Sequence, residues 1–338
     1  MQRSRALLAS LALLVPVLGA GCATDTSIRA QATDYHRELE PAVLSDSELR
    51  DYLQQVGDRV VAAARELHAK KIGPKSAFTD DSSWMFSQEK FHLVNSSTLN
   101  AFTTGGEHAY IYSQLMRECR TEDELAAVVA HEFGHVYARH VHKGTNRQYG
   151  VIGGALLLGA AGYAAGGKEH GKEYAAYGAG LGMIAGNFLA MGFTREDEAE
   201  ADELGFEFHV RAGWDPEQFG GFFQKLIDKG FDKTPEHLSD HPSLSSRVAA
   251  ARQRASALPE NARGWRKPPI ADEGRFAALK ARAEAVGKSM PDDQSLARAK
   301  LLLAAVPSCL VPMESEEQLE ARATLEAAQA AEQGQGKK

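Results

Sequence analysis

The sequence predicts an α+β fold that is mostly helical and carries a small β-sheet. Residues 46–71 repeat apolar side chains at helical spacing, which predicts a long amphipathic helix. Two short apolar or aromatic runs, 91–94 and 109–112, have the length of β-strands and flank a turn-rich stretch with Gly105-Gly106. Further helices are predicted over residues 121–141, 195–209 and 243–257.

The composition is that of a globular protein. The chain has 338 residues, of which 43% are hydrophobic and 25% are charged. These values argue against a disordered chain and against a multispan membrane protein. The length allows one sizeable domain with a smaller appendage. The net charge is -7 and no basic block occurs, so the sequence excludes nucleic acid as a partner.

The first residues have the features of an export signal. Arg3 and Arg5 precede an uncharged, mostly apolar run, and small residues lead up to Cys22. The stretch 6–21 has 16 residues, fewer than the ~20 that a membrane span needs. The segment resembles a bacterial lipoprotein signal, in which residues 1–21 are removed and Cys22 carries the lipid.

That resemblance implies a location. Ala23 after Cys22 points towards the outer membrane, with the protein body on the periplasmic side and only the lipid inserted. Residues 22–44 are mixed and polar and are predicted to form a tether. In an oxidising compartment Cys119 and Cys309 form either a disulfide or two buried free thiols, and the sequence leaves both possibilities open.

Two uncharged stretches, 149–167 and 174–194, are rich in glycine and alanine. Each is long enough to span a bilayer, but small residues give a weak transfer energy. The sequence favours a helical hairpin that packs on the protein body or lies at the membrane surface, with a transmembrane hairpin as the alternative. Beyond residue 256, separate helices are predicted as a C-terminal region that reaches residue 338.

The sequence His131-Glu132-Phe133-Gly134-His135 lies inside the predicted helix that starts with a Thr121/Glu124 capping box. Positions four apart project from one face of a helix, so both imidazoles can bind one zinc ion. Glu132 lies about 100° further round the helix, where it can act on a water as general base and then as general acid. The apolar residues before His131 make this site half-buried, and burying such groups without a partner would be costly.

A third ligand has to come from elsewhere in the chain. A third histidine further along the same run would need glycine at 138 and histidine at 141, and Ala138 and Val141 exclude that class. His140 and His142 are interpreted as helix C-terminal residues that favour the helix dipole. Glu198 and Asp202 share a face with Ala201 and Gly205, small residues that allow close helix packing. The remaining acids are predicted to form a solvated face: Glu196, Glu200 and Glu203.

The pattern also resembles a known family. His-Glu-x-x-His at 131–135, followed by Arg-x-x-Glu-x-x-Ala-Asp at 195–202, is similar to the gluzincin metallopeptidases of the HtpX and CAAX prenyl protease type. The chain is similar in particular to periplasmic BepA-like and LoiP-like lipoproteins and to mitochondrial Oma proteases. The resemblance covers residues 45–255 and includes the segments 100–106 and 241–247. Thr104 stands where many relatives have proline.

This resemblance implies a zincin-type metallopeptidase domain over residues 45–255 that holds one zinc ion. Glu198 would be the third ligand, and Asp202 would orient a ligand imidazole. His241 would stabilise the oxyanion, or occupy the open coordination position in a resting form. The strand around Tyr110 would offer its edge to an extended substrate. The implied substrate-binding residues are Asn100, Ala101, Gly105 and Gly106.

The function that follows is a zinc-dependent endopeptidase that cleaves exposed or unfolded segments of envelope proteins in quality control. One alternative is a non-catalytic, chaperone-like module that binds unfolded clients around a structural metal. Structural zinc sites normally have four closed ligands, whereas here three ligands and Glu132 favour catalysis. A second alternative is a metal-dependent hydrolase of a non-peptide bond.

Overall fold

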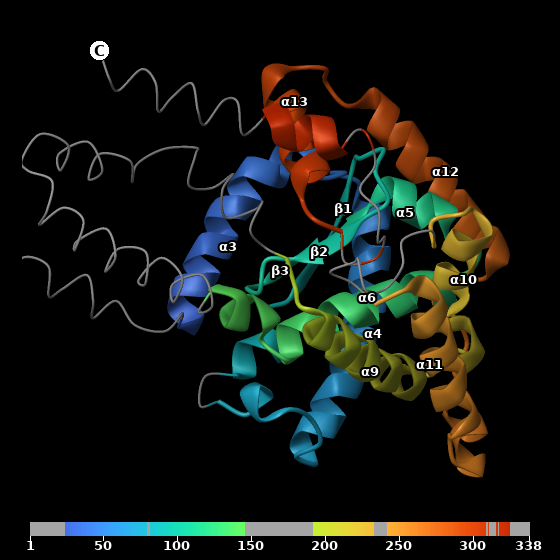
Figure 1. The fold of residues 1–338 in the computed structure, drawn as a ribbon. Helices are drawn as coiled ribbons and strands as arrows, with labels where there is room; N and C mark the ends of the chain where they lie inside the picture. The colour runs from blue at the N-terminus through green and yellow to red at the C-terminus, as the bar shows by residue number, and fades with distance from the viewer. Residues whose placement is uncertain are drawn as a thin grey trace, which may run out of the picture.

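The computed structural model describes residues 24–79, 82–145, 192–232, 242–308, 310, 316 and 318–324. These residues form a mostly helical fold with a small mixed sheet (Figure 1), which confirms the predicted fold class. Cys22, His241, Cys309 and most of the two uncharged stretches lie outside the described residues. Cys119 is buried. None of the described helices is long and apolar enough to cross a membrane.

The sheet has the order β1-β3-β2. Strands β1 (Lys90–Val94) and β3 (His108–Tyr112) are parallel, and β2 (Ala101–Thr103) pairs antiparallel with β3. The two predicted strands are confirmed, but the three-residue β2 was missed inside the turn-rich stretch. Because β3 is central and paired on both sides, the prediction that the strand around Tyr110 offers a free edge is wrong. Among the described strands, β1 and β2 lie on either side of β3, and Val94 of β1 also forms a bridge with Val43.

Helix α4 (Ser47–Ala69) confirms the prediction for residues 46–71 and starts at Asp46, which accepts from the backbone N–H of Leu49. It packs closely on one face of the sheet. A Cβ at Gly57 would lie 2.1 Å from the ring of Phe91, so glycine is required where the helix crosses β1.

Helix α3 (Asp25–Leu39) covers the opposite face of the sheet, where the sequence predicted only a tether. That interpretation is wrong. Thr24 and Ser27 form a capping box that begins the helix. Apolar residues at a spacing of three to four then bury one face of an otherwise polar helix: Ile28, Ala32, Tyr35 and Leu39.

Helix α5 (Ser113–Glu118) follows β3 directly. The next two described helices, α6 (Glu122–Tyr137) and α9 (Arg195–Ala212), pack against each other. Helix α6 ends four residues earlier than predicted, because the chain turns at Arg139, whose φ is 60°. Thr121 caps α6, but the carboxylate of Glu124 accepts from the backbone of Arg120 rather than closing the predicted capping box.

The later helices are α10 (Gly221–Asp228), α11 (Leu244–Ser256), α12 (Glu273–Ser289) and α13 (Gln294–Ala305). Short 3-10 turns complete the fold: η1 (Glu40–Ala42), η2 (Lys75–Ala77), η3 (Ser83–Phe86), η4 (Pro216–Gln218) and η6 (Glu260–Trp265).

The segment before α12 is fastened to the start of α6. The buried carboxylate of Glu122 accepts from the indole of Trp214 and from the backbone of Ile270 and Ala271.

Candidate metal centre

Helices α6 and α9 approach so closely that only small residues fit between them. A Cβ at Gly134 would lie 2.9 Å from the carbonyl oxygen of Ala201, and one at Gly205 would lie 3.0 Å from the backbone of His131. The small residues Ala201 and Gly205 had predicted this close approach. It brings the acidic face of α9 onto the face of α6 that carries both imidazoles.

His131, His135 and Glu198 form one buried group of potential ligands, called here the α6–α9 cluster. The Nε2 atoms of the two histidines are 3.1 Å apart. Glu198 places Oε2 3.5 Å from Nε2 of His131 and Oε1 3.7 Å from Nε2 of His135. The three side chains are at most 1% exposed.

This donor set fits a zinc ion. Ligand atoms about 2.0–2.1 Å from a tetrahedral zinc are about 3.3 Å from one another, close to the separations in the α6–α9 cluster. Neither buried oxygen of Glu198 makes a hydrogen bond to any residue that the structure describes. A buried carboxylate without hydrogen bonds is costly, and a bound cation would offset that cost.

His131 is held by a charged pair behind it. Its Nδ1 lies 2.9 Å from Oδ1 of Asp202. Arg247 donates to both oxygens of Asp202, at 2.8 and 2.7 Å. Burial raises the pKa of Asp202, but Arg247 and His131 outweigh burial and hold the pKa below its usual range. Asp202 is therefore a carboxylate that can orient the imidazole, as the sequence resemblance implied, while Arg247 had been given no role.

His135 is held by a second chain of contacts that the sequence did not predict. Its Nδ1 lies 2.8 Å from Nδ1 of His140, whose Nε2 lies 2.8 Å from Glu200. Lys143 donates to the same carboxylate. The interpretation of His140 as a helix-dipole residue and of Glu200 as part of a solvated face is therefore wrong. His140 follows the turn after α6, and this turn directs it back onto His135.

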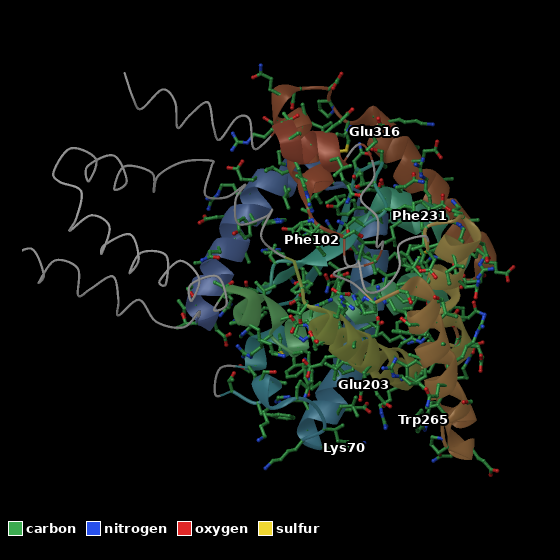
Figure 2. The ribbon with its side chains drawn as sticks, viewed as in Figure 1. Lys70, Phe102, Glu203, Phe231, Trp265 and Glu316 are labelled. Atoms are coloured by element: carbon green, nitrogen blue, oxygen red, sulfur yellow. The ribbon has the colours of Figure 1, made fainter. Side chains whose placement is uncertain are left out.

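The interpretation of His142 as a helix-dipole residue of α6 is also wrong, because His142 lies beyond the end of α6. Its Nε2 lies 2.7 Å from Asp25 on α3, so it ties this segment to the first helix. In contrast, Glu196 and Glu203 of α9 are exposed as predicted, and Figure 2 labels Glu203 beside α9.

The α6–α9 cluster favours a positive charge. Burial lowers the pKa of His131, but Asp202 and Glu198 outweigh this effect and raise it to about 9. Two carboxylates therefore face the imidazoles of this buried site. Arg247 pairs with Asp202 and lies 3.9 Å from Oε2 of Glu198, so it offsets part of their negative charge, and the charge that remains suits a cation. Glu132 is also fully buried, on the α6 turn between the two histidines.

The residues predicted to bind substrate lie along β2 and the turn after it. Asn100 is buried, and its amide donates to the carbonyl oxygens of Val306 and Pro307. Ala101 begins β2. Gly105 has a φ of 74°, and a Cβ at Gly106 would lie 2.5 Å from the Cβ of Ala32. Both glycines are thus required for the turn and for packing, and their role in binding substrate stays a prediction.

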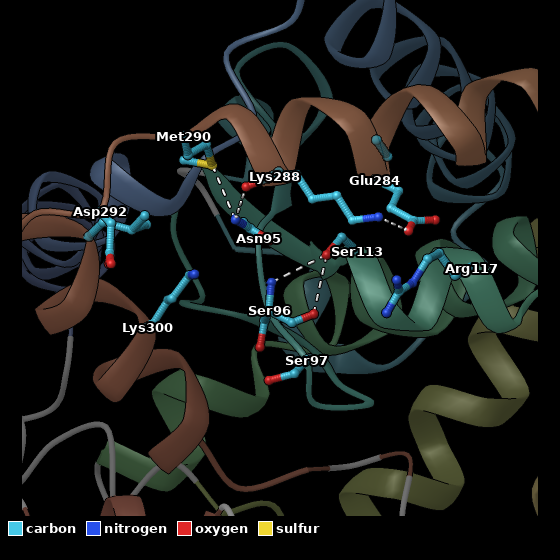
Figure 3. Close-up of a pocket in the computed structure, with 13 residues that line it drawn as sticks. Asn95, Ser96, Ser97, Ser113, Arg117, Glu284, Lys288, Met290, Asp292 and Lys300 are labelled. Carbon is cyan, nitrogen blue, oxygen red and sulfur yellow. Dashed lines mark hydrogen bonds and ion pairs between the residues drawn. The ribbon is translucent and has the colours of Figure 1, made fainter.

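A pocket away from the α6–α9 cluster lies between α5 and the C-terminal helices (Figure 3). Asn95 crosses it, donating to the carbonyl oxygen of Gly287 at 2.9 Å. The residues that line this pocket include none of the candidate metal ligands.

Comparison with known proteins decides the family. The model of peptidase family M48 matches residues 58–255, which include both histidines, Glu198 and Arg247. The chain belongs to peptidase family M48. Its membership confirms the resemblance drawn from the motifs at 131–135 and 195–202.

Relatives of this M48 chain include proteases from bacteria and mitochondria. The beta-barrel assembly-enhancing protease of Yersinia pestis is 31% identical over 72% of this chain and 48% of its own length. The mitochondrial metalloendopeptidase OMA1 of Saccharomyces cerevisiae is 29% identical over 47% of this chain and 45% of its own length. The metalloprotease LoiP of Escherichia coli is 27% identical over 49% of this chain and 63% of its own length. The chain spans about half the length of the first of these relatives.

Proposed function

We propose that this chain is a zinc-dependent endopeptidase that cleaves exposed or unfolded segments of envelope proteins. The observation that carries the proposal is the buried Glu198, which faces two imidazole nitrogens and lacks hydrogen bonds within the described part of the chain. Family membership supports a peptide bond as the target. The name of the beta-barrel assembly-enhancing protease supports envelope proteins as the substrate class.

Each residue of the candidate site would have a distinct role in hydrolysis of the peptide bond. His131, His135 and Glu198 would hold one zinc ion, which acts as a Lewis acid on the peptide carbonyl and acidifies water. Glu132 would accept the proton of the attacking water and pass it to the leaving amine nitrogen. Asp202 keeps the imidazole of His131 oriented. The resemblance assigns His241 to donate a hydrogen bond to the oxyanion.

The resemblance implies that the substrate binds in an extended conformation near Asn100, Ala101, Gly105 and Gly106. Pairing of main chain with main chain reads backbone rather than side chains, which suits unfolded segments of many sequences. The three residues of β2 are buried, and β3 is paired on both sides, so the proposal assigns the substrate to this part of the chain and to no particular strand edge.

We also propose that Cys22 carries a lipid. The lipid would hold the peptidase domain (residues 45–255) and the C-terminal helical region at the inner face of the outer membrane. A Cys22→Ser variant is then expected to lose lipid attachment. It should move to the soluble periplasmic fraction or keep its signal peptide, as fractionation and mass spectrometry would record.

The test of the activity is cleavage of unfolded casein by the mature protein, with and without a chelator. We expect cleavage to stop with the chelator and to return with added zinc. Glu132→Gln should bind the same zinc but cleave at least ~100-fold more slowly, since the general base is lost. Glu203→Gln, an exposed acid on α9, is the matched control. Parental cleavage by Glu132→Gln would overturn the proposed mechanism, and casein binding without cleavage would favour the chaperone-like alternative.

A further inference from the structure

A group of three histidines, separate from the α6–α9 cluster, lies on the far side of the sheet from α4. Strand β1 pairs His92 with Tyr110 of β3, and His108 is two residues before Tyr110. Side chains two apart on a strand, and their cross-strand partners, share one face. His92, His108 and Tyr110 therefore line the face that α3 covers, and α3 places His36 against them.

We propose that His36, His92 and His108, called here the histidine cluster, bind a divalent transition-metal ion that fastens α3 to the sheet. The site shares no residue with the α6–α9 cluster, and the inference does not depend on the proposed peptidase activity. Its donors are three imidazoles without a thiolate, which suits Zn²⁺, Cu²⁺ or Ni²⁺ rather than Mg²⁺ or Ca²⁺.

The distances in the histidine cluster resemble those in the α6–α9 cluster. One ring nitrogen from each of the three histidines lies within 4.8 Å of the others. Nε2 of His92 is 2.9 Å from Nδ1 of His108, compared with 3.1 Å between His131 and His135. Two of the three ligands are thus already placed about as far apart as zinc requires.

His36 would have to rotate to complete the site. Its ring stacks on His108 with centroids 4.2 Å apart and planes within 7°, and a stacked ring does not aim its lone pair at the ion of its neighbour. His36 is only half-buried, so its imidazole has room to tilt. Tyr110 places its hydroxyl 3.0 Å from Nδ1 of His36, where it can orient the ring when Nε2 binds metal.

The imidazoles of the histidine cluster are neutral and keep lone pairs for a metal. Burial lowers the pKa of His36, and burial together with neighbouring charges lowers the pKa of His92 to about 3 and of His108 to about 4. Burial, with a smaller contribution from Glu89, raises the pKa of Tyr110. Burial and Glu107 raise the pKa of Glu89 well above its usual range, so the cluster would hold a cation through its lone pairs rather than through neighbouring negative charge.

A bound ion would join parts of the chain that are distant in sequence. His36 lies on the first described helix, and His92 and His108 lie on the sheet below it. Because the ion would bind only the folded arrangement, it would stabilise the docking of α3 by mass action. In the proposed lipoprotein, α3 follows the lipidated cysteine directly, so the ion would also fasten the anchored end to the protein body.

The test is the number of zinc ions bound per chain. The mature full chain is used without a polyhistidine tag, stripped with a chelator, dialysed against zinc, and assayed by elemental analysis. We expect two zinc ions for the parental chain, one for His92→Ala, one for His135→Ala and none for the double variant. His68→Ala is the matched control, because the Nδ1 of His68 also lies near a tyrosine hydroxyl but its ring neighbours are Phe78, Phe86 and Tyr137.

His36→Gln provides a second variant on a half-buried helix position, in case His92→Ala fails to fold by circular dichroism. It should bind one zinc ion, and added zinc should raise its melting temperature less than that of the parental chain. Equal zinc content in the parental chain, His92→Ala and His36→Gln would overturn the proposal and leave a hydrogen-bonded imidazole stack. Because casein cleavage is not the readout, failure of the peptidase proposal would not affect this result.

Discussion

The α6–α9 cluster and the histidine cluster each gather three ligands, but their surroundings differ. The first is fully buried, includes the carboxylate of Glu198, and is backed by the carboxylate of Asp202. The second is half-buried, contains only neutral imidazoles, and is backed by the hydroxyl of Tyr110. Carboxylates raise the pKa of His131 to about 9, whereas burial lowers that of His92 to about 3.

This difference shows how the surroundings of a histidine side chain can suit it to two kinds of metal site. Negative charge around His131 favours a cation strongly, so we expect the α6–α9 cluster to bind zinc tightly. The histidine cluster offers lone pairs without that charge, so its zinc should leave first when a chelator is added. Each of the following variants changes one feature of this comparison.

The largest effect is expected from Glu198→Gln, which removes a charged ligand from the α6–α9 cluster. Both the zinc ion and the chemistry that depends on it should be lost, so casein cleavage should fall at least ~1000-fold, beyond the loss of the base alone. Elemental analysis should find about one zinc ion fewer per chain. Glu196→Gln changes an exposed acid on the same helix and should keep both zinc and activity. Equal zinc loss from both variants would mean that another carboxylate is the ligand.

His241→Phe should have the next largest effect, and it tests the residue whose role rests on sequence resemblance alone. An oxyanion donor acts mainly in the transition state, so kcat should fall roughly 10- to 1000-fold with zinc and fold retained. If His241 instead occupies the open coordination position in a resting form, basal activity should rise. Unchanged kinetics would remove His241 from the active site.

Asp202→Asn should weaken the α6–α9 cluster without removing a ligand. Loss of an outer carboxylate partner lowers metal affinity about 10- to 100-fold. Arg247 would then lose one of its carboxylate partners, so the variant should also unfold at a lower temperature. Chelator competition measures the affinity, and Asp228→Asn, on the exposed end of α10, serves as a control. A zinc affinity equal to that of the parental chain would show that His131 is oriented without Asp202.

Most of the candidate metal centre could be predicted because its residues lie on two helices with regular spacing. The positions of His131 and His135, four apart, and of Glu198 and Asp202, four apart, follow from helix geometry. The small residues Ala201 and Gly205 then indicated that the two faces meet. The roles of His140, Glu200 and Arg247 could not be predicted, because they depend on the turn at Arg139 and on packing between distant segments.

The histidine cluster carried no such signal. His36, His92 and His108 lie on three separate elements, so no spacing along the chain relates them. The parallel pairing of β1 with β3 sets the register that places His92 beside His108. The helix α3 that adds His36 was itself interpreted as a tether, because its apolar residues are few among polar ones. Strand order also escaped prediction, which is why a free edge was assigned to β3, the central strand.

The smallest effect is expected from Tyr110→Phe, which removes only the hydroxyl behind His36. The ring should keep its stacking on Phe102, whose centroid is 4.8 Å away, so the fold should persist. A neutral hydroxyl orients an imidazole less strongly than a carboxylate does, so zinc affinity of the histidine cluster should fall only about 3-fold. Chelator competition in the Glu198→Gln background isolates this cluster. Tyr112→Phe is the matched control, because that hydroxyl donates to the carbonyl oxygen of Leu303 and its loss should leave zinc binding unchanged. A loss as large as that of Asp202→Asn would mean that the two clusters are oriented by equally strong partners, and the comparison would fail.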